Sequence, residues 1–99
     1  MSSRPLDLCR ALARAYGAAR GLKAGVDCRR WVSSRIITVE VQAEREPGRA
    51  IAVCGGIGPD LDRAAECCLA DFFRSEPLRQ IVSSREELEL ICAAFGGGA

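Results

Sequence analysis

Residues 37–42, ITVEVQ, lead through a REPG turn at 45–48 into RAIAVCGGIG at 49–58, which runs directly into PDLDRAAECCLADFF at 59–73. The first segment alternates apolar and polar residues, as a strand does when one face is packed and the other is wet. Pro47 and Gly48 suit a tight turn into a second, antiparallel strand. Proline, aspartate and regularly spaced alanines then predict a helix. This order of hairpin, glycine loop and helix favours a binding module over a catalyst.

The glycines at 55, 56 and 58 are expected to turn the backbone sharply between the strand and the helix. That helix should begin at Pro59 and Asp60 and end at Pro77, which cannot continue it. Its expected buried stripe consists of Leu61, Ala64, Ala65, Cys68, Leu69 and Phe72. Further on, Ser84 and Glu87 have the spacing of a capping box, which predicts a last helix from Ser84.

Upstream of the hairpin, Pro5 suits the first turn of a helix whose apolar positions recur at helical spacing. This helix should end near Gly17, and residues 17–25 are small enough to read as a connection. Residues 26–32, VDCRRWV, are a candidate first strand, although neither of their alternating faces is cleanly apolar. The side chains expected in one core are Leu8, Leu12, Ile37, Val39, Val41, Ile51, Val53, Ala65, Cys68 and Phe72.

These elements predict an α+β fold in which a helix, a three-stranded antiparallel sheet, a second helix and an extra C-terminal helix follow one another. Ninety-nine residues suffice for one domain, residues 1–99, with a single core. No apolar run approaches the ~18 residues that span a bilayer, and the first residues show no apolar signal-peptide segment. We therefore expect an intracellular protein of the cytoplasm or nucleus without a membrane partner. The arginine-rich first 22 residues leave organellar import open.

Charge is unevenly distributed along the chain, although the net charge is only +1. Residues 1–49 hold ten basic and five acidic side chains, whereas residues 50–99 hold four basic and eight acidic ones. This asymmetry predicts a basic surface near the first helix and strand, and an acidic surface at the C-terminal end. Opposite halves of two copies could then meet head to tail.

The residue types argue against catalysis and against a metal or cofactor. Histidine, the commonest general base, is absent. GGIG at 55–58 lacks the Lys-Ser/Thr ending of a phosphate loop. The six cysteines, at 9, 28, 54, 67, 68 and 92, contain no CxxC pair, so most are expected to be small buried hydrophobes. On a helix Cys67 falls opposite Cys68, so Cys67 should meet solvent. We expect no catalytic residue, metal, cofactor or small-molecule substrate.

Residues 5–74 resemble the double-stranded RNA-binding domain. The resemblance rests on Leu8 and Leu12 in the first helix, on the ITVEV strand, and on RAIAVCGGIG followed by the alanine-rich AAECCLADF. It implies an α-β-β-β-α fold with both helices on one face of the sheet. Residues 75–95 would be a helical extension of that core, and residues 96–99 a flexible tail.

Two of the family's three RNA-contacting regions differ here. The lysines that the family carries at the start of its second helix are replaced by Asp60, Leu61, Asp62 and Arg63. The family's loop between the first two strands is replaced by Val32, Ser33, Ser34 and Arg35. Weak, sequence-independent binding of duplex RNA therefore remains the alternative function, through the candidate residues Arg10, Arg14, Arg29, Arg30 and Arg35.

The function we expect first is protein association, with itself or with a partner in a complex related to double-stranded RNA. The last helix carries an apolar stripe beyond the usual core of the domain, and its members are the candidate interface residues Leu88, Ile91, Cys92 and Phe95. The sequence leaves open whether this stripe forms an interface or folds back over the sheet or the second helix.

Overall fold

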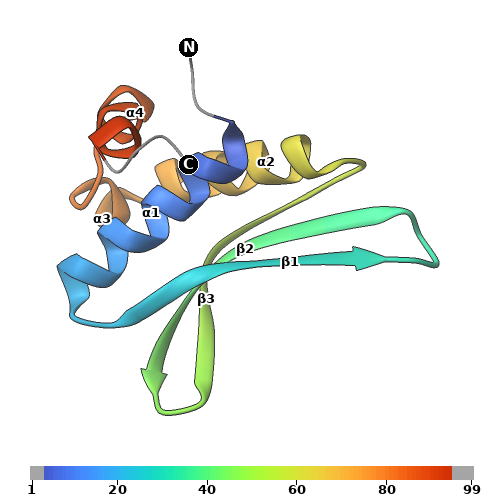
Figure 1. The fold of residues 1–99 in the computed structure, drawn as a ribbon, viewed down its shortest axis with the longest axis horizontal. Coiled ribbons are helices and arrows are strands. Elements are labelled where there is room, and N and C mark those ends of the chain that lie inside the picture. Colours follow the sequence, from blue (N-terminus) through green and yellow to red (C-terminus); the bar gives the residue numbers. More distant parts are fainter. Residues whose placement is uncertain (1–3, 95–99) are drawn as a thin grey trace.

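A computed structural model describes residues 4–94. Its elements are helix α1 (Pro5–Arg20), strands β1 (Lys23–Trp31), β2 (Ile36–Glu46) and β3 (Arg49–Gly58), and helices α2 (Leu61–Arg74), α3 (Glu76–Arg79) and α4 (Arg85–Ala94). The strands form one antiparallel sheet in the order β1-β2-β3. Figure 1 shows α1 and α2 together on one side of the twisted sheet. The predicted α+β fold and order of elements are confirmed.

The first connection is shorter than predicted. Helix α1 continues past Gly17 to Arg20, and Gly21 ends it in the left-handed conformation with φ 66°. Strand β1 begins two residues later, so residues 17–25 are not a loop. A Cβ at Gly17 would lie 2.7 Å from the carbonyl oxygen of Leu22. The missing side chain therefore lets the strand fold back directly against the helix.

The glycines at 55, 56 and 58 do not form the predicted loop, because β3 extends to Gly58. Gly56 and Gly58 instead bring α2 close to the sheet. A Cβ at Gly56 would overlap the carbonyl oxygen of Ala64 and the amide nitrogen of Cys68, and one at Gly58 would lie 2.7 Å from the Ala64 nitrogen. The turn falls at residues 59–60, where the Asp60 carboxylate accepts a hydrogen bond of 2.9 Å from the Arg63 amide.

The core prediction is largely confirmed: Leu8, Leu12, Val39, Val41, Ala65, Cys68 and Phe72 are buried, and Ile37 and Val53 pack at its margin. Ile51 is the error, since 46% of it is exposed. Val41 pairs with Cys54 but Gln42 pairs with Ala52, so Val53 is an extra residue in β3. This bulge places Cys54, rather than Val53, opposite Val41 in the core. Leu61 also lies outside its predicted stripe and is partly exposed.

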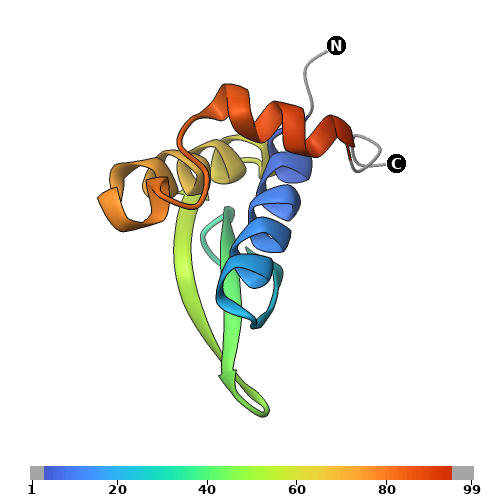
Figure 2. The same cartoon turned by 90° about the vertical axis from the view of Figure 1, so that its left-hand side faces the viewer.

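Of the C-terminal helices, α4 packs on α1 and α3 packs on α2. Helix α2 ends at Arg74, before Pro77, which lies in the first turn of α3. The Ser84 hydroxyl accepts a hydrogen bond from the Glu87 amide, and the Glu87 carboxylate accepts from the Ser83 amide and hydroxyl. Figure 2 shows α4 lying across the end of α1. None of the helices within residues 4–94 is long and apolar enough to cross a membrane.

Candidate binding groove

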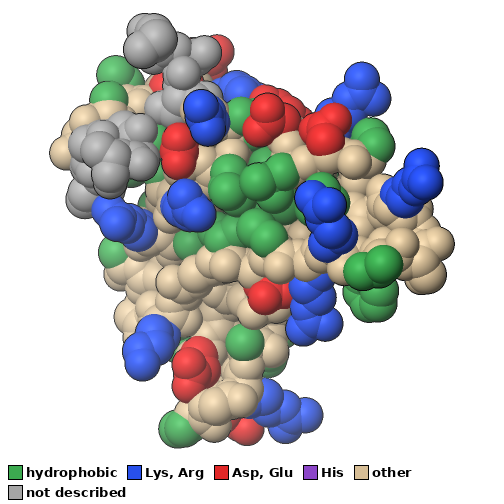
Figure 3. Space-filling view, turned by 45° about the vertical axis from the view of Figure 1, so that its right-hand side comes forward, with side chains coloured by type: hydrophobic (Ala, Val, Ile, Leu, Met, Phe, Trp, Pro, Cys, Tyr) green, Lys and Arg blue, Asp and Glu red, His purple; other side chains and the backbone are tan. Residues whose placement is uncertain are grey.

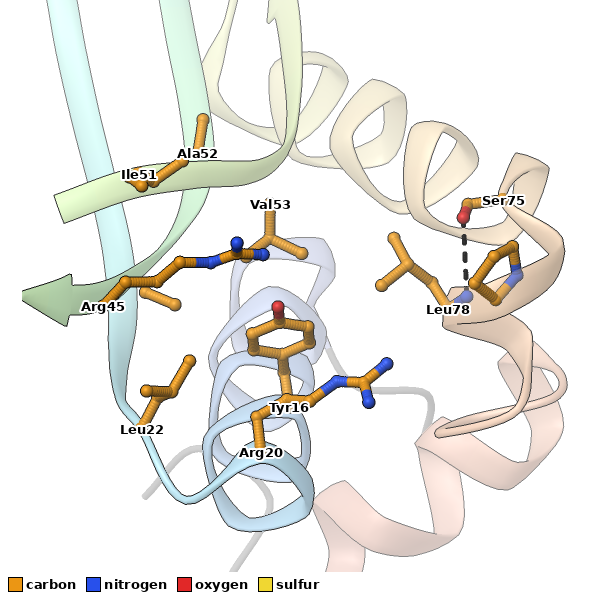
Figure 4. A pocket seen from close by; sticks show the side chains of 11 residues that line it. Tyr16, Arg20, Leu22, Arg45, Ile51, Ala52, Val53, Ser75 and Leu78 are labelled. Carbon is orange, nitrogen blue, oxygen red and sulfur yellow. Dashed lines mark hydrogen bonds between the residues drawn. The ribbon is translucent and has the colours of Figure 1, made fainter.

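A hollow of about 620 Å³ lies between the C-terminal half of α1, the β2–β3 hairpin and α3 (Figure 4). We call it the α1–α3 groove. It is lined by Tyr16, Arg20, Leu22, Ala43, Arg45, Ile51, Ala52, Val53, Ser75, Pro77 and Leu78. A second hollow of about 410 Å³ shares Arg20 and Pro77 with it and continues past Glu76, Gln80 and Ile81. The two together form an extended depression along α3.

Irregularities of the sheet shape this groove. The β2–β3 pairing shifts twice, which leaves Val53 of β3 and Arg45 of β2 without a partner in the register. Both unpaired residues line the groove. Bulges commonly redirect a side chain in this way. The groove could not have been found in the sequence, because the alternating pattern contains no signal for either bulge.

The two arginines of the groove face no acidic partner in the described part of the chain. The Arg20 guanidinium lies 5.9 Å from the centroid of the Tyr16 ring, and no ion pair involves Arg20 or Arg45 among residues 4–94. Figure 4 shows Arg45 reaching in from the sheet and Arg20 extending from the helix beside Tyr16. Leu22, Val53 and Leu78 supply apolar walls. Such a site suits an apolar group that carries a carboxylate beside it.

The five basic candidate residues do not share one surface. In the pairing of β1 with β2, Arg29 lies opposite Thr38 and Arg30 lies opposite Ile37. Because successive residues of a strand point to opposite faces of the sheet, these two arginines do so too. Arg29 also makes an ion pair of 3.1 Å with Asp27. On α1, Arg10 lies 3.6 Å from Asp7, and Arg14 has an interaction of its own. The five arginines predicted to contact RNA therefore lie on more than one surface of the molecule.

Arg30 and Arg35 come together at the tip of the β1–β2 hairpin. With Trp31, Val32, Ile37 and Pro59 they line a hollow of about 340 Å³. Val32 is 88% exposed and Trp31 49%. Figure 3 shows hydrophobic side chains at the centre of this side of the molecule, with both basic and acidic side chains around them.

The predicted interface stripe belongs mainly to the core. Leu88 and Cys92 are buried, Ile91 is partly buried against the core, and Phe95 lies outside the described residues. The Cys92 thiol lies 3.8 Å from the carbonyl oxygen of Asp7. The stripe thus folds back on α1, rather than on the sheet or α2. The apolar residue that α4 does expose is Leu90, at 73%, which sequence reasoning missed because it lies off the stripe.

The cysteines behave as predicted: four are buried, whereas Cys67 and Cys28 are exposed. Cys9, Cys54 and Cys68 meet between α1, β3 and α2, with 3.5 Å between the Cys54 and Cys68 sulfurs. The hydrogen bond to Cys68 and burial raise the pKa values of Cys9 and Cys54. The Cys9 thiol donates to the carbonyl oxygen of Ala65, and either sulfur of the Cys54–Cys68 pair can be the donor. Thiols buried in this way pack as small hydrophobes.

The groove and the hairpin tip are thus two hollows at which exposed arginines meet apolar side chains. Comparison with known proteins gives no match to a family model, to a curated protein or to a solved structure.

Proposed function

We propose that this chain is a non-enzymatic protein-association module with a fold like that of the double-stranded RNA-binding domain. The order α-β-β-β-α and the resemblance of residues 5–74 support this assignment of the fold. In our proposal the α1–α3 groove binds a partner segment with an apolar side chain and adjacent carboxylates. The observation that carries it is the pairing of an apolar wall with Arg20 and Arg45, neither of which has a carboxylate partner within residues 4–94.

The local charges favour a protein partner over a phosphate backbone. A helix N-terminus is a natural phosphate site, but at α2 the Asp60 carboxylate already accepts the Arg63 amide and lies 3.9 Å from the Arg63 guanidinium. Phosphates approaching there would meet a carboxylate. The groove is instead large enough for a side chain of leucine size, and its two arginines lie beside apolar side chains in an open hollow.

The test is a titration with a short helical peptide that carries leucine between glutamates, followed by NMR chemical shifts. Changes should map to Tyr16, Val53 and Leu78. Replacing both Arg20 and Arg45 by Gln should weaken binding about tenfold or more, because each charge-assisted hydrogen bond contributes roughly 1.5–3 kcal/mol. Arg49→Gln is the matched control, since Arg49 is exposed beside Glu46 and does not line the groove. Equal affinity of the double variant and the wild type would overturn the proposal.

Weak binding of duplex RNA is the second candidate, and the exposed Arg30 and Arg35 at the hairpin tip favour it. Phosphate contacts without base readout typically give dissociation constants of ~10⁻⁴ to 10⁻⁶ M. A titration with a duplex of about 20 base pairs at two salt concentrations measures this. Replacing both arginines by Ala should weaken binding to every duplex sequence and reduce the salt slope by about 1 per lost contact. Unchanged binding would remove this candidate.

A further inference from the structure

We infer that the segment bound by the α1–α3 groove is helix α4 of a second copy of this chain. Leu90 of one copy enters the groove of the next, and Glu86 lies against its Arg20 and Arg45. This inference rests on the proposed function of the groove and names its partner.

The donor surface is the outer side of α4. Leu88 and Cys92 turn toward α1 and are buried, so the opposite side of the helix faces away from the molecule. That side carries Leu90, and Glu86 lies four residues before it, one helical turn away on the same side. Glu89 is the neighbouring residue, is half-buried and acts electrostatically on Arg85 of its own helix. An exposed leucine with a glutamate one turn before it is the chemistry that the groove calls for.

The acceptor surface matches it in shape and charge. Its two guanidinium groups flank apolar walls, and the hollow of about 620 Å³ can hold a leucine side chain. Leu90 cannot occupy the groove of its own chain, because it is exposed in the monomer. The contact must therefore be intermolecular. It also agrees with the opposite net charges of residues 1–49 and 50–99.

Donor and acceptor are different surfaces, so the contact is heterologous. A pair of copies still has one unused donor surface and one unused acceptor surface. Association therefore continues head to tail, unless the rotation between successive copies closes a ring. One helix face in one groove is small compared with the roughly 1,200 Å² or more that stable interfaces bury. We therefore expect weak association in the micromolar to millimolar range. It should weaken with salt, because the charges lie at the surface.

The decisive experiment is a mixing experiment followed by sedimentation velocity. The groove variant combines Arg20→Gln with Arg45→Gln, and the helix variant combines Glu86→Gln with Leu90→Ser. All four residues lie in the described part of the chain, and only exposed side chains are changed, so both variants should keep the wild-type thermal transition. Val32→Ser removes an apolar side chain of similar exposure from the distant hairpin tip and serves as the control.

Wild type and Val32→Ser should grow in mean mass with concentration, and each double variant alone should stay monomeric. A mixture of the two variants should form a one-to-one dimer and nothing larger, because only one intact donor and one intact acceptor remain. Self-association of either variant alone, or no dimer in the mixture, would overturn the inference. A wild type that is monomeric throughout but binds the acidic peptide in the groove would overturn the inference alone. Peptide affinity that does not change when Arg20 and Arg45 are replaced would instead overturn the proposed function.

Discussion

The contact between α2 and β3 and the α1–α3 groove lie within the same layer of helices on a sheet, yet one is closed and the other open. At the closed contact, Gly56 and Gly58 face Ala64 and Cys68, so the backbones of helix and strand approach each other directly. At the groove, Tyr16 and Leu78 line the opening and two bulges interrupt the strand pairing. The size of the side chains on this face of the sheet therefore determines where a helix packs closely on the sheet and where a groove remains open for binding.

This difference predicts an uneven response to substitution. Changes at the closed contact should alter the free energy of unfolding, because a packed interior cannot yield without moving backbone. Changes at the exposed arginines of the groove should alter binding and leave stability near that of the wild type, because exposed side chains contribute little to folding.

The largest effect is expected for Gly56→Ala. The added methyl group would overlap backbone atoms of Ala64 and Cys68, which cannot rotate away. Overpacking of this kind should cost about 3 kcal/mol or more. Gly25→Ala is the matched control in β1, where a Cβ meets nothing within 4 Å, and it should be neutral or stabilising by up to ~1 kcal/mol. Urea unfolding of both variants measures the contrast. Equal stabilities would show that the close contact of α2 with β3 is wrong.

The next effect separates two leucines of one helix. Leu88 is fully buried and Leu90 is 73% exposed. Leu88→Ala should reduce the free energy of unfolding by about 2–5 kcal/mol, and Leu90→Ala should change it by less than ~0.5 kcal/mol. Thermal unfolding at low concentration measures both without interference from association. A similar loss of stability in the two variants would mean that α4 does not pack against the core.

The smallest effect concerns the ion pair that joins α4 to α2. The Arg85 guanidinium donates to both oxygens of the Glu66 carboxylate, at 2.7 and 2.8 Å, and these hydrogen bonds hold the pKa of Glu66 below its ordinary value. A lowered folded-state pKa means that the pair stabilises the protein above about pH 4.5 and that this contribution disappears as the pH falls through the folded-state pKa.

Arg85→Ala should therefore lower the melting temperature slightly at pH 7 and leave it nearly unchanged at pH 3. Both side chains are more than 40% exposed, so solvent screening limits the loss to less than about 1 kcal/mol. Arg49→Ala, in the more exposed pair with Glu46, should show no such dependence. A difference that persists at pH 3 would mean that Arg85 acts through packing rather than charge.

The sequence predicted the structure correctly wherever one strong local pattern determined it. Val39 and Val41 alternate with polar residues, and Ala65, Cys68 and Phe72 recur at helical spacing, so the second strand, the second helix and most of the core could be predicted. The prediction of a loop at the glycines of β3 was wrong, because glycine before a proline is typical of a turn. Only the position of the opposing helix shows that close packing requires these glycines.

The site was less predictable than the fold. Arg20 and Arg45 are far apart in sequence, and a bulge directs Arg45 toward the groove. The stripe that contains Leu88 could be recognised as apolar, but the sequence could not say which surface would cover it. The surface that covers it is the N-terminal part of α1, where the Cys92 thiol lies 3.8 Å from the carbonyl oxygen of Asp7.

The cluster of Cys9, Cys54 and Cys68 lies where α1, β3 and α2 meet, and this position makes the native thiols natural reporters of folding. A thiol reagent should modify Cys28 and Cys67 at once, whereas the clustered thiols react only when the three elements separate. The slow phase of modification then measures how often the centre of the molecule opens, with no engineered label. The same three clustered cysteines that pack as hydrophobes therefore record, by their reactivity, the motion of the core they fill.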